Sequence, residues 1–158
     1  MMQKIRRFRR LLSTKVREQQ IIQVELAERL TAEQNVLAQI DGLKLERQRA
    51  LDEFVTQVGR VFSPRDLWHQ RQHIECIDTD MECKERELAA LRRAIEETKA
   101  RLLEQYREVR LLENYVERLQ AADTAVRLSA EQDELDDLAC MRFNSTREEF
   151  PCDPVSRM

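Results

Sequence analysis

Glycine and proline are scarce in this sequence of 158 residues, which contains 2 glycines and 3 prolines. A fold with many strands or many loops needs these residues at its turns, so the sequence predicts few chain reversals. Ala, Glu, Lys, Leu and Arg together make up half of the chain, which is typical of long helices and coiled coils when an apolar repeat accompanies it. The composition therefore favours an all-α protein built on two long helices.

Long apolar runs are also missing. No stretch approaches the ~18 apolar residues of a membrane-spanning helix, and no apolar segment follows the basic start as in a signal peptide. We therefore expect a soluble, cytoplasmic chain. The four scattered cysteines indicate reduced thiols rather than a disulfide framework: Cys76, Cys83, Cys140 and Cys152.

Residues for catalysis or metal binding are few. His69, His73, Cys76 and Cys83 stand at i, i+4, i+7 and i+14. The first three share a helix face, but Cys83 lies too far along the helix to complete a tetrahedral zinc site, so we expect no metal. Neither a Ser/His/Asp set nor a glycine-rich phosphate loop occurs. We predict a protein that is not an enzyme and needs no cofactor.

An apolar repeat with alternating steps of four and three residues runs along most of the chain. It extends from Ile5 to Val61 and again, more regularly, from Ile74 to Val126. Because each stripe would otherwise face water, the two helices are expected to pack as a long antiparallel coiled-coil hairpin.

The expected boundaries follow from capping residues. Ser63, Pro64 and Asp66 predict a helix start, and Gly59 could close the preceding helix in the left-handed conformation. Ser129 is a candidate cap for a separate short helix. We thus predict a hairpin over 3–142 and a disordered tail over 143–158, with the hairpin divided into helix 1 (about 4–58), a turn (about 59–63), helix 2 (about 64–127) and a short helix (about 130–142).

Charge is distributed unevenly although the net charge is only -3. The first 17 residues hold seven cations and no acid, whereas acids dominate residues 131–158. A basic arm of this kind could meet nucleic acid, an anionic membrane or an acidic protein, and the acidic remainder argues against nucleic acid. The apolar residues among these cations are either covered by Leu128, Leu135 and Leu138 folding back, or they form a docking tip.

The layout resembles a known family. The run Phe8-Arg9-Arg10-Leu11-Leu12, followed by Lys15 and Glu18, precedes a long helix, a hinge near Trp68, a second long helix and the acidic segment Asp133-Glu134-Leu135-Asp136-Asp137. Over residues ~3–142 this arrangement is similar to the FliJ/YscO family. These are the coiled-coil stalk proteins of type III secretion systems, flagellar or injectisome.

The resemblance implies an accessory protein at the cytoplasmic face of the inner-membrane secretion apparatus. Its tip would enter the hexameric export ATPase, and its other partners would be the cytoplasmic domain of the export gate and, for some members, export chaperones. It would reach the membrane only through these partners. By position, the partner-binding residues would be Ile5, Arg6, Arg7, Phe8, Arg9, Arg10, Leu11 and Leu12 at the tip and Trp68 near the hinge.

Two alternatives remain open from the residues alone. One is a self-associating structural coiled-coil scaffold, and the other is a nucleic-acid-binding protein that uses the basic arm. Both share the predicted helices, so only partner binding and oligomeric state distinguish them from a stalk protein.

Overall fold

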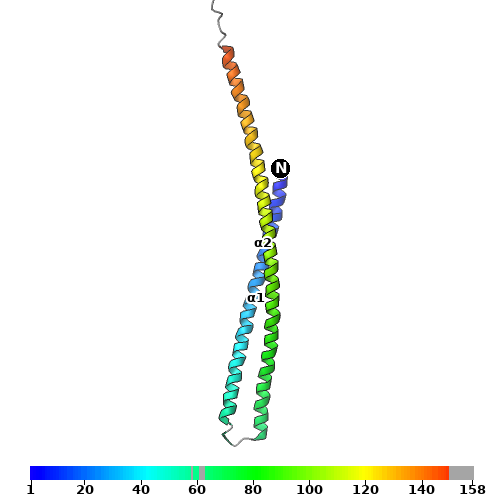
Figure 1. The fold of residues 1–158 in the computed structure, drawn as a ribbon, viewed down its shortest axis with the longest axis vertical. Helices are drawn as coiled ribbons and strands as arrows, with labels where there is room; N and C mark the ends of the chain where they lie inside the picture. Colours follow the sequence, from blue (N-terminus) through cyan, green and yellow to red (C-terminus); the bar gives the residue numbers. More distant parts are fainter. Residues whose placement is uncertain (58, 61–62, 150–158) are drawn as a thin grey trace, which may run out of the picture. The chain divides into compact units, whose positions relative to one another are not determined.

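Two long helices make up the part of the chain that the structure describes. The computed structural model describes residues 1–149 except 58, 61 and 62. In this part of the chain α1 (Met2–Gln57) and α2 (Pro64–Glu149) pack together, and no strand occurs (Figure 1). The predicted all-α coiled-coil hairpin is therefore confirmed.

The turn between the helices follows its predicted capping residue. The backbone N–H of Arg65 donates to Ser63 Oγ at 3.2 Å, and the N–H of Asp66 donates to Ser63 O at 3.0 Å. Ser63 thus caps α2, as expected from the sequence. Gly59 differs from the expectation, because no described residue has a positive φ. Instead, the N–H of Arg60 donates to Gln57 O at 2.9 Å just after α1 ends. Val58, at the expected end of helix 1, lies outside the described residues.

The structure also differs from the expectation at Ser129. The predicted short helix over about 130–142 is part of α2, which continues through Ser129 to Glu149. The physical reason is that a capping side chain satisfies a helix end but does not create one, and neither glycine nor proline interrupts residues 65–149. Residues 143–149 of the predicted disordered tail are likewise helical, and residues 150–158 lie outside the described residues.

The chain divides into two compact units. Unit 1 comprises Met1–Thr14 with Val109–Met158, and unit 2 comprises Lys15–Glu108. In each unit the segments of α1 and α2 run antiparallel, and the apolar repeat forms a seam between them. The buried apolar side chains of the seam are Ile5, Val109 and Val116 in unit 1 and Val36, Ile40, Ile77 and Ile95 in unit 2.

A polar crossing interrupts the seam of unit 2. Thr98 is fully buried, and its hydroxyl donates to Ala94 O at 2.8 Å. Arg29 reaches across from α1 and donates to the Thr98 hydroxyl and, at 2.8 Å, to Ala94 O. Glu25 then pairs with both Arg29 and Arg101, at 2.7 and 2.9 Å. A buried polar contact of this kind favours one register, because any slip would leave these groups unpaired.

Candidate partner-docking site

The start of α1 packs on α2 within unit 1. Ile5 is 8% exposed, and the half-buried ring of Phe8 meets Tyr115 edge-on with ring centroids 4.8 Å apart. Lys4 Nζ stands 6.0 Å from the centre of the same tyrosine ring, within the range of a cation–π contact. These contacts hold the first two turns of α1 against α2.

Five cations project from this segment, which we call the basic end (residues 4–12). Lys4, Arg6, Arg7, Arg9 and Arg10 are all exposed, and none forms an ion pair with any residue whose side chain the structure describes. The guanidinium of Arg9 instead contacts the Gln120 amide. When the amide is oriented with its oxygen toward Arg9, that oxygen accepts hydrogen bonds from Nη2 at 2.7 Å and Nε at 3.1 Å.

The position of these cations on the helix is electrostatically unfavourable. The first turn of α1 contains no acid, and the N-terminus of a helix carries a partial positive charge that repels cations. Among the described residues, the first cation of α1 that pairs with an acid is Lys15, which lies 2.9 Å from Glu108 and 3.3 Å from Glu18. Hydrogen bonds to Glu108 and then to Glu18 raise the pKa of Lys15. The basic end is thus a concentration of uncompensated charge, as expected of a surface that binds an acidic partner.

The apolar residues of the basic end have different surroundings. Ile5 is buried and Phe8 and Leu12 are half-buried, whereas Leu11 remains 44% exposed. The alternative in which the C-terminal leucines fold back is wrong for the structure described. Those leucines lie farther along α2 and are exposed: Leu128, Leu135 and Leu138. Sequence reasoning missed Tyr115 and Gln120, because only the register of the two helices brings them beside Phe8 and Arg9.

Trp68 lies in unit 2, near the turn. Its side chain is 58% exposed and touches His69 edge-on, with ring centroids 5.2 Å apart. It borders an open groove between α1 and α2 whose apolar lining is Leu51, Phe54, Leu67, Trp68 and Ile74. An exposed tryptophan beside such a groove is suited to bind an apolar side chain of a partner.

The described residues hold no group of potential metal ligands and no helix suited to span a membrane. In this part of the chain no group of three or more His, Cys, Asp or Glu side chains could hold a metal ion. His73, one of the candidate ligands, instead lies 4.0 Å from Glu46. Among the residues described, neither helix combines the length and apolar character needed to cross a membrane.

Comparison with known protein families gives a match that covers nearly the whole chain. The model of a family described as Flagellar FliJ protein matches residues 3–148, nearly the whole chain. No curated protein and no solved structure matches the chain.

Proposed function

Because the chain belongs to the FliJ family, a non-catalytic family associated with flagellar and type III protein export, we propose that it is a central-stalk protein of such an export system. In this proposal the basic end docks inside the hexameric export ATPase, and the chain couples the ATPase to the cytoplasmic domain of the export gate. The protein works in the cytoplasm, at the inner-membrane apparatus, and reaches the membrane only through its partners. Export chaperones are further candidate partners.

The basic end is the observation that carries this proposal. Five exposed cations lie within residues 4–10, at the helix end where the dipole disfavours them. Such an arrangement lowers local stability, and a partner with acidic residues would relieve the repulsion on binding. Leu11 supplies an exposed apolar contact beside the charges.

The asymmetry of unit 1 suggests how docking could affect catalysis by the ATPase. The five cations belong to α1 alone, while the neighbouring surface of α2 carries Asp123 paired with Arg127 at 2.9 Å. Inside a ring, this unit presents different faces to the six subunits. A ligand that binds subunit conformations unequally shifts their populations, so an asymmetric ligand can bias six nucleotide sites differently.

A titration of the cognate export ATPase with the full chain tests the proposal. We expect ATP hydrolysis to rise and to saturate with added protein, because docking shifts the ring toward its active conformations. Absence of binding and stimulation at every ionic strength would contradict the proposal. Self-association without any effect on the ATPase would favour the scaffold, and steeply salt-dependent binding to DNA or RNA would favour the nucleic-acid-binding protein.

We further propose that the groove beside Trp68 contacts the cytoplasmic domain of the export gate. Trp68→Ala is expected to weaken binding to that domain by about 10-fold or more, since a large aromatic anchor often contributes most of an interface's energy. The stability of the chain should change little, because the side chain is 58% exposed. Isothermal titration calorimetry with the purified gate domain measures the effect.

The matched control for this variant is Leu103→Ala, which truncates another exposed side chain of α2 within unit 2. Equal affinities of wild type, Trp68→Ala and Leu103→Ala would assign the gate contact to another surface. The ATPase titration does not depend on this result, so the two parts of the proposal are tested separately.

A further inference from the structure

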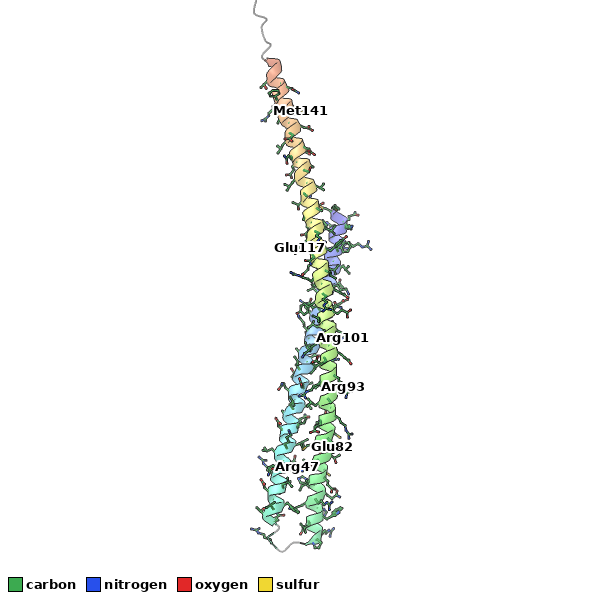
Figure 2. The ribbon with its side chains drawn as sticks, viewed as in Figure 1. Arg47, Glu82, Arg93, Arg101, Glu117 and Met141 are labelled. Atoms are coloured by element: carbon green, nitrogen blue, oxygen red, sulfur yellow. The ribbon has the colours of Figure 1, made fainter. Side chains whose placement is uncertain are left out.

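The C-terminal part of α2 lies past the start of α1 in unit 1. We call residues 128–146 the α2 extension, and every residue in it is exposed. Figure 1 shows this orange-red part of α2 continuing beyond the N-terminus, and Figure 2 labels Met141 on it. Its large apolar side chains are between 57% and 68% exposed: Leu128, Leu135, Leu138, Met141 and Phe143. A helix with five such side chains presents an apolar surface that no other part of the described structure covers.

The leucines of the extension do not continue the seam of unit 1. In that seam Val109 and Val116 are 6% and 5% exposed, and further steps of seven residues lead to Asp123, Ala130 and Asp137. Leu128 and Leu135 also stand seven residues apart, but they precede the seam positions Ala130 and Asp137 by two residues. Leu138 stands three residues after Leu135. Two residues correspond to about 200° around a helix. The extension therefore carries a second stripe, with coiled-coil spacing, that faces away from the direction of the seam.

The charges around this stripe restrict what can pair with it. The extension contains five acids and one cation: Glu131, Asp133, Glu134, Asp136, Asp137 and Arg142. Glu131 and Glu134 lie on the side of the leucine stripe, because each stands four residues, about one helical turn, before a leucine of that stripe. Pairing with the extension of a second copy would bring ten carboxylates together along one short helix pair. Like charges at the flanks of a coiled coil oppose association, whereas opposite charges select a partner.

We infer that the α2 extension is a docking helix for a basic amphipathic helix of another protein. The leucine stripe packs against apolar residues of the incoming helix, and the carboxylates on the same side, those of Glu131 and Glu134, pair with its lysines and arginines. This is helix-on-helix recognition, in which spaced apolar anchors give affinity and flanking charges give specificity. It is separate from docking by the basic end, because it uses another segment and a partner of opposite charge.

Synthetic helices provide the probe. One peptide of about three heptads has Leu at positions a and d and Lys at e and g. A second peptide has the same composition in shuffled order, and a third replaces each Lys with Glu. We expect the full chain to bind the first peptide about 10-fold or more tightly than the other two, measured by fluorescence anisotropy at low ionic strength.

Two variants of the extension and two matched controls locate the binding surface. Leu135→Gln with Leu138→Gln should weaken binding of the basic amphipathic peptide about 10-fold, and Glu131→Gln with Glu134→Gln should weaken it several-fold and reduce its salt dependence. The controls are Leu103→Gln with Leu111→Gln and Asp80→Asn with Glu85→Gln, which change exposed residues elsewhere. Both controls should keep the wild-type affinity, and circular dichroism should show equal helicity in all five proteins.

Three results would overturn the inference. If the shuffled peptide binds as tightly as the first peptide, the extension attracts basic peptides by charge alone and the leucine stripe is not a specific binding site. Equal loss of affinity in variants and controls would place the contact outside the extension. Concentration-dependent dimers in sedimentation, abolished by Leu135→Gln with Leu138→Gln, would identify a second copy as the occupant.

Discussion

Replacing the four arginines of the basic end with glutamine is expected to slow association with the export ATPase about 10- to 100-fold at low ionic strength. The variant is R6Q, R7Q, R9Q and R10Q. Its association rate should depend only weakly on salt and should approach the wild-type rate at high salt, because screening then removes the steering field. Stimulation of ATP hydrolysis at limiting concentrations of the chain should fall accordingly. Stopped-flow fluorescence and steady-state hydrolysis measure the two effects.

The fold of this variant should be unaffected or slightly stabilised. All four side chains are exposed, and removing cations from the N-terminal end of α1 relieves an unfavourable interaction with the helix dipole. We therefore expect the association rate to fall while stability stays level or rises slightly. If these arginines served only the fold, their replacement would lower stability together with the association rate.

The matched control is R49Q, R65Q, R93Q and R107Q. It removes the same number of charges from exposed arginines in unit 2 that form no ion pair among the described residues. If this control slows association as much as the first variant, the total charge of the chain matters and the basic end is not a specific site. Wild-type rates and stimulation in the first variant would likewise refute docking through these arginines.

Alanine variants of Phe8 and Leu12 are less decisive. Both side chains are half-buried, and Phe8 packs against Tyr115, so a loss of stimulation could arise from loosening unit 1 as well as from a lost contact with the ATPase. Leu11 offers a cleaner apolar test because it is 44% exposed. Leu11→Ala is therefore the apolar variant that reports on contact with the ATPase.

Much of the fold could be predicted from the apolar repeat. Ile40, Ile95 and Val116 all lie on the predicted stripes and are buried. Val36 was missed, because a straight helix has 3.6 residues per turn and its buried face drifts across a strict seven-residue repeat. The continuation of α2 through Ser129 was also missed, since capping residues mark possible ends and do not decide them.

The candidate site was less predictable. The sequence shows which side chains near the N-terminus are apolar or cationic, but packing decides which of them remain exposed to solvent. The ring of Phe8 packs against Tyr115 because the register of the two helices places that tyrosine opposite it. Register depends on the turn and on contacts such as Arg29 with Thr98, which join residues 69 positions apart. A periodicity read within each helix contains no information about such pairings.

Replacing Ile95 with alanine is expected to lower the free energy of unfolding by about 2–4 kcal/mol. Ile95 is 3% exposed in the seam of unit 2, three residues before the fully buried Thr98. Truncation removes apolar contacts and leaves a cavity that the surrounding side chains fill only in part. The loss should stay below the upper range of globular cores, because the seam of two helices is partly open to water. Urea denaturation followed by circular dichroism measures the change.

Leu103→Ala is the control, since Leu103 is 53% exposed on the same helix and its truncation should change stability by less than about 0.5 kcal/mol. Equal effects of the two substitutions would show that the helices do not pack through this seam. The same experiment separates a hairpin within one chain from the scaffold alternative. In a hairpin both helices belong to one molecule, so the unfolding midpoint of wild type and of Ile95→Ala should not depend on protein concentration. A midpoint that rises with concentration would mean that the seam joins two chains, because mass action then stabilises the folded state.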